Sequence, residues 1–107
     1  MSLLKGTLDV LVLKALTWGP MHGFEITTWL EERSGGHFDV EDGALFQALH
    51  RMEERDLISA EWGVTENNRR ARYYRLTTAG RTHFKAESAR MTSYVAALTG
   101  ILNARSA

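Results

Sequence analysis

Apolar side chains recur every three or four residues through the first half of the chain, and this spacing predicts three helices. The first helix is expected over Leu3–Trp18, where a Gly-Pro pair ends it, and the second over Gly23–Arg33, before a turn at Ser34–Gly36. Asp39 is expected to cap the third helix. The inner faces of the first and third helices are expected to consist of Leu4, Leu8, Leu11, Val12 and Ala15, and of Leu45, Ala48, Leu49 and Met52.

The apolar period changes to two after the third helix. In "ISAEWGV", Ile58–Val64, apolar residues alternate with polar or small ones, which is typical of a half-buried strand. "ARYYRL", Ala71–Leu76, alternates in the same way, and "TENNR" between them favours a turn, so a hairpin is expected. A last helix is expected to begin at Thr77 or Thr78 and to end near Asn103. Its apolar positions repeat at nearly seven-residue spacing: Phe84, Met91, Tyr94, Val95, Leu98, Ile101 and Leu102.

This order of elements predicts a mainly α (α+β) fold, the winged helix-turn-helix, with a two-stranded wing and a C-terminal dimerisation helix. Residues 1–80 are expected to form the winged helix-turn-helix domain and residues 81–107 the dimerisation helix, within one structural unit. The last helix is longer than one small core can cover. Its apolar stripe is therefore interpreted as a homodimer surface, and the alternative is that it folds back on its own domain. The three tryptophans are interpreted as core or interface residues.

Positive and negative residues are segregated along a chain whose formal net charge is zero. Residues 37–65 hold seven acids and two arginines, whereas residues 69–90 hold seven bases and one glutamate. A basic block within a neutral protein indicates a local anionic partner. The acids Asp39, Glu41 and Asp42 are interpreted as stabilising the start of the third helix, with their side chains turned towards the protein.

The basic block falls on the predicted hairpin, and this placement indicates double-stranded DNA as the partner. In a winged helix-turn-helix the third helix can enter the major groove while the wing lies against phosphates or the minor groove. Arg69, Arg70 and Arg72 are placed to meet phosphates, and Tyr73 can add a hydroxyl donor. The face of the third helix opposite its apolar arc carries the candidate groove contacts Gly43, Ala44, Gln47, His50 and Arg51.

The sequence carries no pattern typical of an enzyme, such as a glycine-rich phosphate loop or a nucleophile elbow. It has no cysteine, and its four histidines lack the spacing of a metal site, so we expect no catalysis, metal or cofactor. Charged residues interrupt the apolar start of the chain, which predicts neither a signal peptide nor a membrane span, and we expect a cytoplasmic protein. The rival hypothesis is a winged helix that binds a protein partner, which would not need a basic wing.

Five stretches, from Leu3 to about Glu87, resemble PadR-type transcriptional regulators in their order and spacing. They are "LLKGTLDVLVLKAL", "GPMHGFEI", "DGALFQALHRMEERDLI", "SAEW" and "RRARYYRLTTAGR". The resemblance implies a homodimeric, usually repressing, DNA-binding protein of the compact subgroup, whose single last helix builds the dimer. Some relatives respond to phenolic acids or drug-like molecules held near the dimer interface, so a small hydrophobic or aromatic ligand is a further candidate partner.

Position by position, the resemblance assigns two sets of residues to the DNA-facing helix and to the basic wing: Gly43, Ala44, Phe46, Gln47 and His50, and Arg69, Arg70 and Arg72. The family commonly has tyrosine at Phe24 and Phe46, threonine at Ala44 and proline at Gln47. The missing hydroxyls remove phosphate donors, so binding is expected to depend more on the wing. The amide of Gln47 can read adenine.

Overall fold

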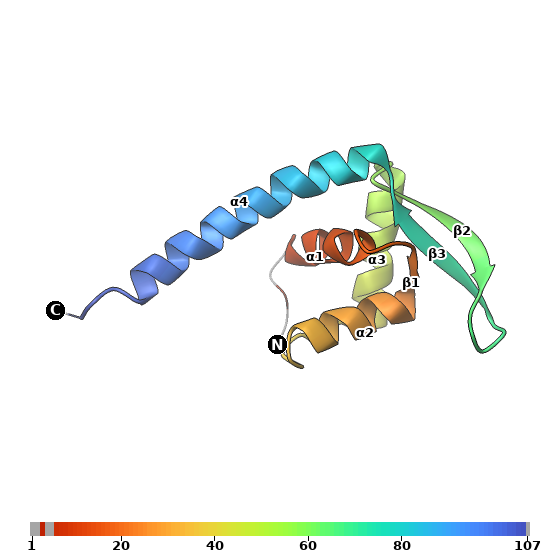
Figure 1. Cartoon of the computed structure of the whole chain (residues 1–107), viewed down its shortest axis with the longest axis horizontal. Coiled ribbons are helices and arrows are strands. Elements are labelled where there is room, and N and C mark those ends of the chain that lie inside the picture. Colours follow the sequence, from red (N-terminus) through yellow and green to blue (C-terminus); the bar gives the residue numbers. More distant parts are fainter. Residues whose placement is uncertain (1–2, 4–5, 107) are drawn as a thin grey trace.

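Figure 1 shows the fold in a computed structural model that describes residue 3 and residues 6–106. Its elements are α1 (Thr7–Leu16), β1 (Met21–His22), α2 (Gly23–Arg33), α3 (Asp42–Glu54), β2 (Ile58–Val64), β3 (Arg70–Leu76) and α4 (Thr78–Leu102). The strands form one antiparallel sheet in the order β1-β3-β2. The β2–β3 hairpin and the far end of α4 project from opposite sides of the first three helices. The predicted winged helix-turn-helix with a two-stranded wing is confirmed.

The first three helices lie where the apolar spacing predicted them, with differences at two of their starts. α1 begins at Thr7, later than expected, and Leu4 lies outside the described residues. The prediction that Asp39 caps α3 is wrong, because Glu41 occupies the N-cap position and its side chain makes no capping hydrogen bond. Val40 packs against the core, and the segment from His37 to Glu41 is not helical.

One apolar core lies between the first three helices and the base of the sheet. The predicted inner arc of α3 is confirmed, since its four residues are each at most 1% exposed: Leu45, Ala48, Leu49 and Met52. They share a cluster with Leu13, Leu16, Ile26 and Leu30 of α1 and α2. Burial of one such leucine side chain contributes about 2 kcal/mol. The buried arc therefore determines which side of α3 faces solvent.

β2 and β3 pair along their whole length, but only the base of this hairpin reaches the core. Ile58 lies opposite Leu76, and both are buried. Further out, Trp62 lies opposite Arg72, and Trp62 and Val64 are each 61% exposed. The expected half-buried strand is confirmed at the base and wrong at the tip, because the hairpin extends past the helices (Figure 1).

A two-residue strand, β1, completes the sheet and is missing from the sequence-based prediction. Met21 pairs with Tyr74, and His22 pairs with Tyr73. Two residues are too few to show an alternating pattern, so the sequence carries no signal for this strand. β1 places the start of α2 directly beside the wing.

α4 begins as predicted, with Thr77 at its N-cap, where the hydroxyl accepts a hydrogen bond from the Gly80 N–H at 2.9 Å. The same hydroxyl donates to the carbonyl of Asp56 at 2.6 Å, and the Thr77 N–H donates to the carbonyl of Leu57 at 3.1 Å. Phe84 packs against the core, and from Thr92 to Leu102 every residue of the helix is exposed. The projecting helix extends the molecule to 60 Å along its longest axis (Figure 1). Five apolar residues in this exposed part are 43–80% exposed: Tyr94, Val95, Leu98, Ile101 and Leu102.

Gly80 permits a close approach between α4 and the turn after α3. An ideal Cβ at Gly80 would lie 1.9 Å from the carbonyl oxygen of Leu57, so a larger residue forces the backbone apart. We predict that Gly80→Ala lowers the free energy of unfolding by about 2 kcal/mol or more, measured by urea unfolding. Gly43→Ala is the matched control, because a Cβ there meets nothing within 4 Å. Equal decreases in both variants would contradict this role of the contact.

Candidate nucleic-acid interface

The outward face of α3 is set by the buried arc on its other side. The residues predicted to enter a groove are all exposed on this helix: Gly43, Ala44, Phe46, Gln47, His50 and Arg51. Phe46 is 55% exposed, and its ring lies close to α2, where an ideal Cβ at Gly23 would be 3.6 Å from Phe46 Cε1. α3 thus presents an aromatic ring, an amide and an imidazole to solvent, and these groups can make apolar and hydrogen-bonded contacts to base edges.

Two side chains of this face are paired with acids of their own chain. Nη2 of Arg51 lies 2.9 Å from Oδ1 of Asp9 on α1, and Nε2 of His50 lies 2.6 Å from Oε1 of Glu54. The pairs are exposed enough to contribute little to stability, but they orient the side chains. A DNA phosphate must therefore compete with Asp9 for the Arg51 guanidinium.

The acids at the start of α3 are not arranged as the sequence analysis expected. Asp39, Glu41 and Asp42 are all exposed, so the interpretation that they turn towards the protein is wrong. The non-helical segment before α3 carries these side chains outwards. Asp39 and Glu41 line a shallow cavity of about 370 Å³ together with Gln47 and Arg51. This end of the α3 face is therefore negative.

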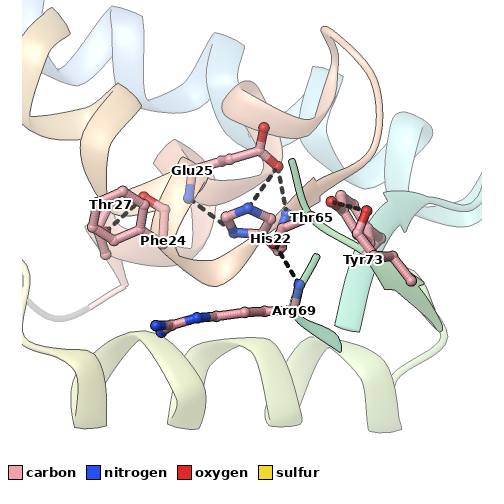
Figure 2. Close-up of polar contacts among 8 residues, drawn as sticks. His22, Phe24, Glu25, Thr27, Thr65, Arg69 and Tyr73 are labelled. Atoms are coloured by element: carbon pink, nitrogen blue, oxygen red, sulfur yellow. Dashed lines mark hydrogen bonds and ion pairs between the residues drawn. The ribbon is translucent and has the colours of Figure 1, made fainter. Parts of the chain in front are cut away.

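The start of α2 lies beside the wing and is held by His22. Its Nδ1 accepts a hydrogen bond from the Glu25 N–H at 3.3 Å, while the Glu25 carboxylate accepts one from the His22 N–H at 3.1 Å (Figure 2). These reciprocal bonds form a capping box with histidine at the capping position. The His22 ring also meets Tyr73 of β3 edge-on, with ring centres 5.3 Å apart. His22 thus connects the first turn of α2 to the wing.

Two of the four wing arginines are paired with acids from other strands or helices. Nη2 of Arg72 lies 2.8 Å from Oε2 of Glu53 on α3, and Nη2 of Arg75 lies 2.7 Å from Oε1 of Glu61 on β2. The first pair joins the wing to α3, and the second lies on the opposite face of the hairpin because side chains alternate along β3. Burial raises the pKa of the neighbouring Tyr74, so this phenol stays neutral. The wing is therefore less positive than its sequence indicates.

Arg69 and Arg70, nearer the tip, form no ion pair with a carboxylate of the described residues. The Arg69 backbone closes the turn, because its N–H donates to Oγ1 of Thr65 at 3.2 Å and its carbonyl accepts from the Thr65 N–H at 2.8 Å (Figure 2). The guanidinium carbon of Arg70 lies 4.7 Å from the ring centre of Trp62. These two arginines keep their N–H donors available for an anion.

Besides its contact with His22, Tyr73 makes two contacts within the wing. Its ring covers Gly63, where an ideal Cβ would lie 2.8 Å from the ring, and its hydroxyl donates to the carbonyl of Val64 at 3.4 Å (Figure 2). This bond is long and weak. The phosphate contact predicted for Tyr73 requires its hydroxyl to leave the Val64 carbonyl.

A groove of about 860 Å³, here named the wing groove, lies between the wing and the starts of α2 and α3. Its lining combines aromatic and basic side chains: His22, Phe24, Phe46, Trp62, Arg69 and Arg70. Phe24 is 76% exposed, so this surface carries uncovered rings beside free guanidinium groups. Such a combination suits the sugars and phosphates of a nucleic acid. The groove brings residues predicted separately on α3 and on the wing to one surface.

Three residues that shape this surface were not predicted from the sequence: Asp9, His22 and Glu53. Trp62 was predicted as a core or interface residue, but its exposure at the wing was not foreseen. Asp9 and Glu53 hold arginines that lie 42 and 19 residues away, and such distant pairs leave no local pattern. His22 does have a signal, since a glutamate follows three residues later as in a capping box. The exposure of Trp62 depends on how far the hairpin extends beyond the core.

Over residue 3 and residues 6–106, no helix combines the length and the apolarity needed to cross a membrane. The same part of the chain contains no cluster of three or more acidic or histidine side chains that could hold a metal ion.

The model of the transcriptional regulator PadR-like family matches residues 12–86. A PadR-like transcriptional regulator of Bacillus cereus has a similar structure, with 20% identity and a TM-score of 0.80 over 94% of this chain and 96% of that one. A PadR-like transcription factor of Bacteroides fragilis is 26% identical, with a TM-score of 0.73 over 91% of each chain. Bacillus subtilis PadR in complex with operator DNA is 18% identical, with a TM-score of 0.67 over 76% of this chain and 46% of that one.

The matched region begins within α1 and ends within α4, so it contains the three-helix core, the outward face of α3 and the whole wing. The family consists of transcriptional regulators, in agreement with the prediction that the chain is not an enzyme. On this match, which covers well over half of its residues, the chain belongs to the PadR-like family of transcriptional regulators.

Proposed function

We propose that the protein is a homodimeric repressor that binds a pseudo-palindromic operator through α3 and the wing of each subunit. Residues 1–80 act as the DNA-binding domain and residues 81–107 as the dimerisation helix. The two α3 helices enter successive major grooves on one side of the duplex, with half-sites about 10 bp apart. Bound over a promoter, the dimer blocks polymerase.

This proposal rests on the guanidinium groups of Arg69 and Arg70. Neither forms an ion pair with a carboxylate of the described residues, and both line the same groove as Phe46 of α3. Guanidinium groups bind phosphates through several N–H donors and fix the register of a protein on DNA. The relative from Bacillus subtilis, which has the same fold, is described in complex with operator DNA. We assign phosphate contacts to Arg69 and Arg70, and base contacts to Gln47 and His50.

The stripe along α4 supports a dimer as the binding form. Its residues follow the spacing of a two-helix seam, and the outer five are exposed: Tyr94, Val95, Leu98, Ile101 and Leu102. A contiguous apolar stripe of this length on a projecting helix favours association with a second copy. Met91 is half-buried and extends the stripe inwards, whereas Phe84 is already packed on its own core. A small apolar ligand that binds one arrangement of the two subunits better than another would release the operator.

A protein-binding module is the second candidate function. It is favoured by the uncovered rings in the wing groove, those of Phe24, Phe46 and Trp62. Such rings are enriched in protein interfaces. Salt dependence separates the two functions, because phosphate binding through arginines releases counterions and an apolar interface does not.

Selection of duplexes from a random library by the purified protein tests the proposed function. We expect enrichment of an inverted repeat whose half-sites are about one helical turn, roughly 10 bp, apart. Gln47→Ala is expected to relax the preference at one position in each half-site by about 1–3 kcal/mol. No enrichment by the folded wild-type protein would reject sequence-specific binding and favour the protein-binding module.

The double variant Arg69→Ala/Arg70→Ala is expected to weaken binding to all duplexes. Its slope of log affinity against log salt should decrease by about 0.9 for each phosphate that is no longer bound, as measured by fluorescence anisotropy at several salt concentrations. Arg75→Ala is the control for the loss of a wing arginine as such, and it should leave the slope unchanged, because Arg75 is paired with Glu61 on the other face of the hairpin. The wing would have no part in phosphate binding if the double variant kept the wild-type slope.

Leu98→Glu is expected to disrupt the dimer. A carboxylate in the centre of an apolar seam costs several kcal/mol, so sedimentation should show a molar mass of 12.1 kDa for the variant and twice this value for the wild type. Ser93→Glu adds the same charge on the opposite side of α4 and should leave the dimer intact. A monomeric wild type would overturn the assignment of α4.

A further inference from the structure

Trp62 contributes little to the packing of the fold. It is 61% exposed, it lies beyond the part of the hairpin that reaches the core, and its cross-strand neighbour is Arg72. An exposed indole leaves a large apolar surface in water, which is unfavourable unless another group covers it. Its ring is met by the guanidinium of Arg70, whose central carbon lies 4.7 Å from the ring centre.

The strand register makes this contact possible. Val64 is the residue directly opposite Arg70, and Trp62 is two residues further towards the core on the same face of β2. Long and aromatic side chains can reach such diagonal neighbours across an antiparallel pair. Tryptophan is also the aromatic residue that attracts a cation most strongly. The side chain of Arg70 therefore lies back along the wing over the indole.

An ion pair and an aromatic stack restrain an arginine in different ways. The bond from Arg72 to Glu53 uses guanidinium N–H donors, which are then not available to another anion. The guanidinium of Arg70 lies over the Trp62 ring, and Arg70 forms no ion pair with a carboxylate of the described residues. A guanidinium that stacks on a ring through its flat face keeps the N–H donors at its edge free. Trp62 thus restrains Arg70 without occupying its hydrogen-bonding groups.

We propose that Trp62 is a positioning residue for Arg70, holding the guanidinium in place so that its free edge meets a DNA phosphate. This inference rests on the proposed DNA-binding function. A restrained arginine loses less side-chain freedom when it binds, so the stack raises affinity without adding a contact to DNA. Arg69, in the adjacent turn, binds its phosphate without such a restraint on its side chain.

A double-mutant cycle between Trp62 and Arg70 tests the proposal through DNA affinity. Trp62→Ala should weaken binding roughly two- to fivefold for each wing, the range expected for an exposed cation–π contact. The same substitution in an Arg70→Ala background should have no effect, because the group that Trp62 positions is absent. Trp62→Phe should retain much of the affinity, and Trp62→Leu, which is apolar but has no π-face, should behave like Trp62→Ala.

Arg69 supplies the matched control for this cycle, because the cation–π contacts of the described residues include one between Arg70 and Trp62 and none between Arg69 and Trp62. Effects of Trp62→Ala and Arg69→Ala should therefore add. Additive effects of Trp62→Ala and Arg70→Ala would overturn the proposal, and so would wild-type affinity in Trp62→Leu, which would assign the ring a simple apolar contact with DNA. Unfolding midpoints should stay unchanged in all variants, since these side chains are exposed.

The stack can also be measured without DNA, which separates this inference from the proposed function. In the free protein, the indole should shift the NMR signals of the Arg70 side chain upfield, and Trp62→Leu should abolish the shift. Absence of this shift in the wild type would overturn the inference even if the operator binds. If the Arg70 signals are shifted upfield but the protein binds no duplex, the proposed function and the positioning role are rejected, and the contact between Arg70 and Trp62 is confirmed.

Discussion

The backbone carbonyl of Leu57 is the point at which α3, the wing and α4 are joined. Leu57 lies between α3 and β2, its carbonyl accepts the N–H of Thr77 at 3.1 Å, and Gly80 of α4 approaches the same oxygen too closely for a side chain. Asp56 precedes it with a left-handed backbone (φ 58°) that ends α3, and its carbonyl accepts the Thr77 hydroxyl. A few backbone contacts therefore fix how α3, the wing and α4 are oriented relative to one another.

The four arginines of the wing form two groups, those that pair with an acid of the protein and those that form no such pair among the described residues. Arg72 and Arg75 are paired with Glu53 and Glu61, so their positive charge is largely neutralised within the protein. The guanidinium groups of Arg69 and Arg70 can attract phosphates, whereas the exposed acids at the start of α3 repel phosphates. The candidate interface is thus positive at the tip of the wing and negative at the start of α3. This gradient favours an approach in which the wing meets the DNA backbone first.

The sequence predicts those parts of the fold that depend on local burial. The arc from Leu45 to Met52, the cap at Thr77 and the turn after Val64 follow from spacing and residue type, and the structure has them. The α3 cap at Asp39 was mispredicted, because the segment from His37 to Glu41 is not helical and packs Val40 against the core. The pairing of Arg51 with Asp9 and of Arg72 with Glu53 was not predictable, because these acids come from elements that only the tertiary fold brings near.

In the proposed dimer, the length of α4 makes the distance between the two α3 helices sensitive to the way in which the two α4 helices pack. A helix of 25 residues spans about 37 Å, and its outer half has no packing against its own domain. If the crossing angle between two such helices changes by about 10°, their inner ends move by about 6 Å over this length. The half-site distance of an operator is fixed by the DNA helical repeat, so a shift of this size takes one α3 helix out of register. A ligand bound at the seam would therefore control DNA binding without touching α3 or the wing.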